Sequence, residues 1–145
     1  MSGLDVRRIE RLLMEMEEAF DIISSSLSVG EESFLSDIKS IYAVRYAIVK
    51  IVETASLMGA HILEIQYGIA AETYSDIFEQ LGRRGVISPD ISDGFRRLVG
   101  LRNLIVRRYW VIDDSRIYRE ATGNGLKIIR EFIERIRRYV KERAR

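Results

Sequence analysis

The chain has 145 residues, enough for one domain with its own core, and its 23 basic and 22 acidic residues leave a net charge of +1. It has no cysteine, which excludes disulfide scaffolds, thiolate catalysis and cysteine-ligated zinc. No apolar run reaches the roughly 18 to 20 residues of a membrane span, and the N-terminus lacks the apolar region of a signal peptide, so we expect a cytoplasmic protein without membrane contact.

Apolar side chains at three- and four-residue spacing predict two helices in the first half of the chain. The first covers residues 6–27, and a run of serines with a glycine predicts a turn within residues 24–32. Ser33 or Ser36 is expected to cap the second helix, which reaches about residue 68, with Gly59 as a candidate kink.

The second half of the chain predicts three further helical segments. Residues 73–81 form a short helix closed by glycines, and the next helix starts at Ser88 or Asp90 with Pro89 in its first turn. A last helix starts near Asp113, is loosened at residues 123–125 and resumes to Val140. No stretch alternates as a strand does, so we expect an all-α fold, an antiparallel up-and-down bundle of four to five helices, as a single domain over residues 1–145.

Charge and polar composition are uneven along the chain. Residues 1–40 hold four basic and nine acidic residues, whereas residues 127–145 hold eight basic and three acidic ones. Either these two ends are neighbours whose charges offset one another, or the basic end attracts phosphate. Only two asparagines and two glutamines occur beside heavy use of arginine, glutamate and isoleucine, a composition typical of thermophilic proteins.

Metal and cofactor motifs are missing from the sequence. A ferritin-type bundle site needs a glutamate followed three residues later by a histidine, and the single histidine, His61, has no such glutamate before it. The glycine patterns of phosphate loops and hydrolase elbows do not occur. We therefore expect no metal and no cofactor.

The run Gly94–Asp113, GFRRLVGLRNLIVRRYWVID, concentrates the polar chemistry of the chain on a segment that is otherwise apolar. Its five arginines favour either a solvated helix face paired with the acidic first helix or a site that binds phosphate. Asn103 and Arg107 are four residues apart and share one helical face, while Arg102 and Tyr109 are seven apart and share another. Two polar edges are therefore expected to flank one groove.

The order Arg102, Asn103, three residues, Arg107, one residue and Tyr109 resembles the motif of HEPN domains, specifically the HepT-like toxins encoded beside a minimal nucleotidyltransferase antitoxin, MntA. In that family the motif is arginine, usually asparagine, three residues, histidine, any residue and tyrosine. The resemblance extends from about Asp37 to Tyr118. It implies a helical bundle and a metal-independent ribonuclease that works as a homodimer with facing motifs, silenced when the nucleotidyltransferase attaches AMP to the motif tyrosine.

Carried over to this chain, the resemblance implies that Arg102 and Asn103 are catalytic and that Tyr109 accepts AMP. Arg107 occupies the histidine position. Because arginine stays protonated, it binds phosphate and stabilises negative charge but does not exchange a proton as histidine does. We therefore expect cleavage to be weakened or lost while binding of RNA, such as tRNA or mRNA, is retained.

Other residues are expected to support this site. Glu53 could orient Arg102 through an ion pair or be an ordinary exposed acid, and Arg108 adds positive charge beside the motif. Trp110 is interpreted as a packing or dimer-contact aromatic, and His61 could replace the missing histidine only by reaching across from its own helix or from a partner subunit. A non-catalytic helical binding or regulatory subunit of a minimal nucleotidyltransferase is the alternative function, and a purely structural bundle is a third.

Overall fold

The structure, a computed structural model, describes residues 3–143, without the side chain of Tyr109, and every regular element in this range is helical. This confirms the predicted all-α fold. No helix in the described range is long and apolar enough to cross a membrane. The elements are α1 (Val6–Leu27), α2 (Glu31–Leu35), α3 (Ile38–Tyr67), α4 (Tyr74–Arg83), α5 (Pro89–Arg107), the 3-10 turn η1 (Tyr109–Val111), α6 (Asp114–Glu120), the π-helical turn η2 (Ala121–Gly125) and α7 (Leu126–Arg143).

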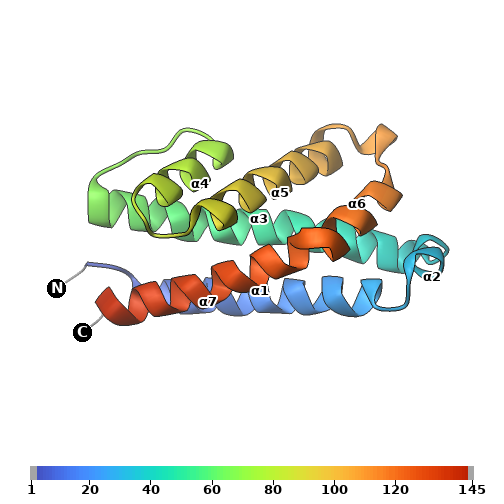
Figure 1. Cartoon of the computed structure of the whole chain (residues 1–145), viewed down its shortest axis with the longest axis horizontal. Helices are drawn as coiled ribbons and strands as arrows, with labels where there is room; N and C mark the ends of the chain where they lie inside the picture. Colours follow the sequence, from blue (N-terminus) through green and yellow to red (C-terminus); the bar gives the residue numbers. More distant parts are fainter. Residues whose placement is uncertain (1–2, 144–145) are drawn as a thin grey trace.

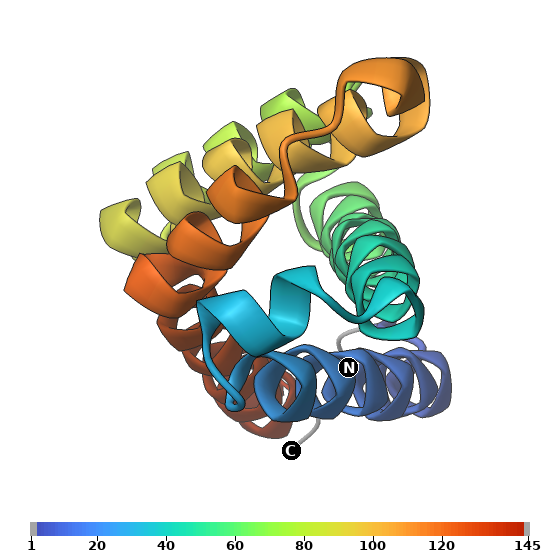
Figure 2. The same ribbon diagram turned by 90° about the vertical axis from the view of Figure 1, so that its right-hand side faces the viewer.

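The long helices lie along one axis of the molecule (Figure 1). Seen from the end of the bundle, α1, α3, α5 and α7 form its four sides, with α4 beside α5 and the short α2 at one end (Figure 2). Helix α1 packs against both α3 and α7, and α5 packs against α3, α4 and α7. Helix α5, which carries the basic stretch, is therefore held by neighbours on both flanks.

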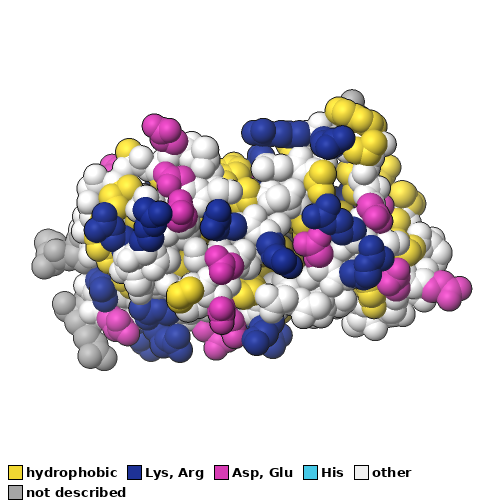
Figure 3. Space-filling view, turned by 45° about the horizontal axis from the view of Figure 1, so that its top comes forward, with side chains coloured by type: hydrophobic (Ala, Val, Ile, Leu, Met, Phe, Trp, Pro, Cys, Tyr) yellow, Lys and Arg dark blue, Asp and Glu magenta, His cyan; other side chains and the backbone are white. Residues whose placement is uncertain are grey.

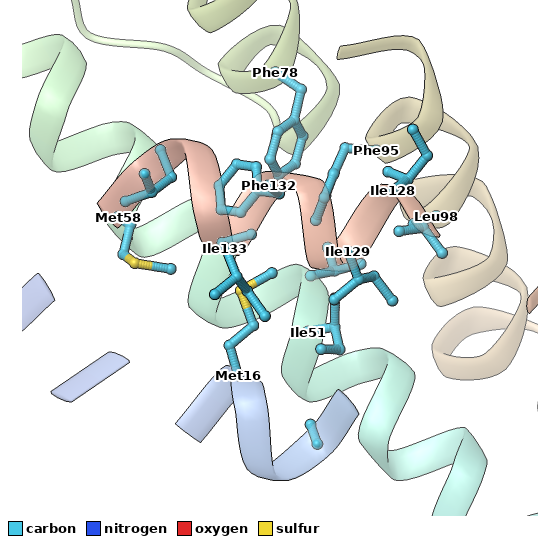
Figure 4. Packing of buried hydrophobic residues seen from close by; sticks show 14 of the residues in the cluster. Met16, Ile51, Met58, Phe78, Phe95, Leu98, Ile128, Ile129, Phe132 and Ile133 are labelled. Atoms are coloured by element: carbon cyan, nitrogen blue, oxygen red, sulfur yellow. The ribbon is translucent and has the colours of Figure 1, made fainter. Parts of the chain in front are cut away.

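Three phenylalanines join α4, α5 and α7 in the core (Figure 4). The ring centroids of Phe78 and Phe95 are 4.8 Å apart, and those of Phe95 and Phe132 are 4.6 Å apart. All three side chains are fully buried. Such tilted aromatic pairs add to the hydrophobic free energy of burial, so this cluster sets the position of α5 in the bundle.

The start of α3 differs from the prediction. The expected caps Ser33 and Ser36 are wrong, because the chain first forms α2, a five-residue helix that periodicity does not detect, and Ser36 ends it. Asp37 caps α3 instead, and its carboxylate accepts a hydrogen bond of 3.1 Å from the Lys39 amide. A hydrogen bond from the Ser40 hydroxyl keeps this carboxylate ionised by lowering the pKa of Asp37.

Gly59 lies within the unbroken helix α3 at the contact with α4. A Cβ atom at this position would lie 2.7 Å from Ile77 Cγ2 and 2.8 Å from Leu81 Cδ1. The glycine therefore admits the close approach of α4 rather than a break in α3. This approach brings the start of α4 toward α5.

The acidic and basic ends of the chain are neighbours. Helix α1 packs on α7, where Arg137 forms an ion pair with Glu17 and the Arg130 guanidinium lies 5.1 Å from the centroid of the Phe20 ring. On its other side α1 is joined to α3 by Lys50 and Glu15 at 2.7 Å. The acidic first segment and the basic last segment of the chain therefore offset part of each other's charge where α1 packs against α7.

The loosening predicted near residues 123–125 is confirmed as the π-helical turn η2. The amide of Leu126 donates to the carbonyl of Ala121, five residues back, before α7 continues. This wide turn lies beside α5, where Gly94 is buried against Ile128.

Substitution of Gly94 by alanine is predicted to destabilise the fold. The new Cβ would lie 2.6 Å from Ile128 Cγ1 and 2.8 Å from its Cγ2, two atoms near the backbone of α7 that cannot swing away. Overpacking of this kind costs about 1–3 kcal/mol, which urea denaturation would measure.

The matched control is Gly100→Ala, on the same helix. No atom lies within 4 Å of the position of its Cβ, so alanine should raise the free energy of unfolding by up to about 1 kcal/mol. Equal effects of the two substitutions would contradict the packing role of Gly94.

Candidate functional site

A groove of about 470 Å³ lies between the α3–α4 connector and the second half of α5. It brings three residues of the predicted motif together with the start of α4. The lining residues are Ala71, Glu72, Thr73, Tyr74, Ser75, Ile77, Val99, Arg102, Asn103 and Arg107.

Two local features fix the walls of this groove. On α5, Phe95, Leu98 and Val99 are buried, so Asn103 and Arg107 are turned toward the rim. On the other wall the Thr73 hydroxyl caps α4 by accepting a hydrogen bond of 3.0 Å from the Asp76 amide, which ends the connector at a defined point.

Arg102 is held between two neighbours. Its Nη1 donates a hydrogen bond of 3.1 Å to Asn103 Oδ1, and its guanidinium carbon lies 4.9 Å from the centroid of the Tyr74 ring. Its Nε is buried and has no hydrogen-bond partner among the described residues. Buried donors are normally paired, so the unpaired Nε makes Arg102 an unusual position, and its oriented guanidinium fork matches an anionic acceptor group.

The groove is electropositive. Arg102 and Arg107 both line it, Arg107 is exposed, and Glu72 is the one carboxylate among the lining residues. Two guanidinium groups facing one carboxylate favour an anionic ligand, and phosphate matches their forked donors.

Tyr109 does not share a helical face with Arg102, contrary to the prediction from spacing. Helix α5 ends at Arg107, the exposed Arg108 is its C-terminal cap, and Tyr109 begins the 3-10 turn η1. The side chain of Tyr109 is outside the described part of the structure. The backbone places this residue just beyond the groove, at the end of α5.

The segment after η1 is tied back to the bundle by an ion pair with two hydrogen bonds. Arg45 Nε and Nη2 donate to the two carboxylate oxygens of Asp114 at 2.9 and 2.7 Å. The carboxylate of Asp114 raises the pKa of Arg45. The turn that carries Tyr109 is therefore a short span between α5 and an anchored α6.

Glu53, a predicted supporting residue, and His61, considered as a replacement for the missing histidine, are not among the residues that line the groove. Glu53 is exposed on α3 and forms no ion pair with Arg102 in the described range, so the expected pairing within one chain is not made. The His61 Nε2 accepts a hydrogen bond of 2.9 Å from the Asp5 amide, so this imidazole holds the N-terminal segment against α3.

The sequence did not reveal the opposite wall of the groove. Glu72, Thr73 and Tyr74 belong to the connector and to α4, and no spacing rule relates them to α5. Only a general rule pointed to a residue such as Tyr74: a buried or half-buried arginine needs a partner, and an aromatic ring can be that partner.

Comparison with known proteins assigns the chain to a family. Residues 16–136 match the family described as HepT-like, Ribonuclease HepT-like. The chain belongs to the HepT-like family. No curated protein sequence matches it. The family match covers α3, α4 and α5 completely, which are the elements that build the groove.

Solved structures share this fold at low sequence identity. The structure of a cytosolic protein of unknown function, YutE from Bacillus subtilis, is 19% identical with a TM-score of 0.83, covering 98% of this chain and 94% of that chain. A tri-AMPylated Shewanella oneidensis HEPN toxin in complex with its MNT antitoxin is 21% identical with a TM-score of 0.81, covering 90% and 97%. A toxin–antitoxin structure with AMP-PNP has the same identity and a TM-score of 0.79, covering 89% and 97%.

The contact between Tyr74 and Arg102 is predicted to be energetically coupled. The test is a double-mutant cycle of Tyr74→Leu and Arg102→Met. The loss of unfolding free energy in the double variant should differ from the sum of the two single losses by about 0.5–2 kcal/mol, because each single variant already removes the same cation–π contact. Urea denaturation of the four proteins measures this.

Tyr74→Phe is the matched control, since it keeps the ring and should keep the coupling with Arg102. Strict additivity of Tyr74→Leu and Arg102→Met would show that the ring does not hold the guanidinium.

Proposed function

We propose that this HepT-like protein is the toxin-type ribonuclease of a toxin–antitoxin pair, with cleavage weakened by arginine at the histidine position. The single observation that carries the proposal is the shared groove of Arg102, Asn103 and Arg107, in which Arg102 is oriented by Asn103 and Tyr74. The proposed location is cytoplasmic, and the proposed ligand is RNA.

The chemistry of the groove supports binding more strongly than cleavage. When a ribose 2′-hydroxyl attacks the adjacent phosphorus, the bond from phosphorus to the 5′-oxygen breaks. One group must accept the 2′ proton, a proton must reach the leaving 5′-oxygen, and donors must stabilise the charge on the phosphate oxygens. Arg102 and Arg107 supply donors, and Arg108 adds charge at the end of α5. None of these arginine side chains accepts a proton at neutral pH. The Glu72 carboxylate, at the same groove, is the acid–base group that any remaining cleavage would use.

We further propose that the chain forms a homodimer, and the exposed face of α3 supports this. Tyr42, Tyr46 and Leu57 lie along one stripe of the helix and are 60%, 68% and 46% exposed, and Glu53 lies on the same stripe. Large apolar side chains aligned on one exposed face favour burial in an interface. In such a dimer Glu53 would be available to an arginine of the second copy.

The proposed partner is an MntA-like minimal nucleotidyltransferase that attaches AMP to Tyr109. Support comes from the place of this residue in the 3-10 turn between Arg108 and Trp110, both of which are exposed. An acceptor tyrosine must enter the active site of another protein, and a short projecting turn allows this. Its oxygen would bond to the α-phosphorus of ATP, with pyrophosphate as the leaving group.

Arg107 also supports a second candidate, a non-catalytic helical subunit that docks and regulates the nucleotidyltransferase. The groove would then bind a nucleotide or RNA phosphate without breaking a bond. The two candidates differ in one measurable property, which is cleavage of RNA by the purified protein.

Arg107→His should increase RNA cleavage by about 10²–10⁴-fold, because it supplies a group that exchanges protons near neutral pH at the motif position where Arg107 does not. Time courses with purified protein and structured RNA, including tRNA, would measure the rate. Residual cleavage by the unchanged protein should fall with Glu72→Gln.

The control for this gain is Arg102→Ala in the Arg107→His protein, which should abolish the added activity by removing a phosphate donor. If Arg107→His cleaves no faster than the unchanged protein while it still binds RNA, the ribonuclease proposal is wrong and the regulatory subunit is favoured.

Incubation with a co-encoded nucleotidyltransferase and ATP should add adenylyl groups to Tyr109. Intact mass and peptide mapping would locate the modification, and Tyr109→Phe should remove it. Tyr46→Phe is the matched control, since it removes a tyrosine hydroxyl from α3, on a different element from the turn that carries Tyr109, and should not affect labelling. Modification of a different residue in the unchanged protein would reject Tyr109 as the acceptor.

A further inference from the structure

A second cavity lies on the opposite flank of α5 from the motif groove. It has a volume of about 250 Å³ and is bounded by the first half of α5 and by α6, η2 and the start of α7. With 3.6 residues per helical turn, Arg97 and Leu101 are rotated about the axis of α5 by about 80–160° from Asn103 and Arg107. Helix α5 therefore separates two concave surfaces.

Two unpaired arginines line this cavity. Arg97 on α5 and Arg119 on α6 are exposed, and neither forms a hydrogen bond or ion pair within residues 3–143. The one lining carboxylate, Glu120, is already bound by Arg116 at 2.5 Å. Two guanidinium groups that line one cavity and have no ion-pair partner in the described range favour an anionic ligand.

The π-helical turn η2 forms the far wall of the cavity. Gly123, Asn124 and Gly125 all line it, and Asn124 is exposed and carries an amide that can donate a hydrogen bond. A π-turn costs regular helix geometry and is often found at functional positions. Here the π-helical turn is wider than an α-helical turn and lies beside the two arginines.

After the two arginines and the turn η2, a third feature is Gly100. It lies on the exposed surface of α5 between the two concave surfaces. A Cβ at this position would meet no atom within 4 Å, in contrast to Gly94 on the same helix. Glycine inside a helix costs about 1 kcal/mol relative to alanine, and no packing contact requires it here. A glycine on an open helix surface allows a ligand backbone to approach closely.

We infer that the cavity of Arg97 and Arg119 is a second phosphate-binding site, for an RNA strand that also occupies the motif groove and crosses α5 over Gly100. This inference rests on the proposed function, because it assigns the path of the same substrate. A strand that crosses α5 must span the width of a helix, about 10–12 Å, and a few nucleotides of single-stranded RNA cover this distance.

The surface on this side of the molecule agrees with the inferred path. Figure 3 shows lysine and arginine side chains distributed across the visible face, with aspartate and glutamate side chains between them. On α5, Arg96 and Arg97 lie one turn before Gly100, and Asn103 and Arg107 lie one and two turns after it. The strand would meet a positive group on either side of the glycine.

Binding of a fluorescent single-stranded RNA, measured by anisotropy at several salt concentrations, tests the inference without requiring cleavage. The double variant Arg97→Ala/Arg119→Ala should weaken binding at least about tenfold, since charged hydrogen bonds to phosphate are lost. The slope of log affinity against log salt should fall by about 0.7 for each lost contact.

The matched control is Arg7→Ala/Arg11→Ala, which removes the same charge from exposed positions of α1. If both double variants bind equally, the second site is rejected. Arg102→Ala separates the two proposals: RNA binding that depends on Arg102 but not on Arg97 and Arg119 removes this inference alone, whereas an unchanged protein that binds no RNA removes the proposed function as well.

Gly100→Leu tests the crossing point. It should weaken binding, while Gly100→Ala should bind as the unchanged protein does, and light scattering should give the same molecular mass for all three. Unchanged binding by Gly100→Leu would reject the crossing. An altered mass would show that Gly100 lies in a contact between copies of the chain, and this outcome would also reject the crossing.

Discussion

The contact between Phe78, Phe95 and Phe132 is the constraint on which the functional surfaces depend. These rings join α4, α5 and α7 at the centre of the bundle, with centroids 4.6 to 6.3 Å apart. Because Phe95 is at the centre, the rotation of α5 about its own axis is set by this packing. Every polar residue of α5 then has a fixed direction, toward α4, toward α6 or toward solvent.

The same packing explains why Arg102 has an oriented guanidinium. Phe78 holds α4 against α5, and the ring of Tyr74, at the first position of α4, then lies beneath the Arg102 guanidinium. Gly59 adds to this by letting α4 approach α3 closely. The charged group is placed by apolar contacts several residues away, which costs less than fixing a long side chain by ion pairs alone.

Sequence periodicity predicted the long helices because burial repeats with the helical turn, and it predicted the loosened turn before Leu126 because glycines weaken a helix. It missed α2, which has five residues and is too short to show a period. It also extended α5 through Tyr109, since neither glycine nor proline marks the end at Arg107 and apolar residues continue to Ile112. The motif residues on α5 were identified in advance, but Tyr74 was not, because its contact is tertiary.

If the proposed function holds, Arg107 at the histidine position of the motif alters what neutralisation by a partner would require. Because an arginine side chain stays protonated at neutral pH, the RNA binding proposed for the groove would not depend on cleavage. A protein that only binds RNA can still be harmful by occupying it. AMP on Tyr109 would add a phosphate and a base to the turn that follows Arg107 and Arg108 at the end of α5. The added negative charge would compete for the arginines that hold RNA, so modification there would block binding as well as cleavage.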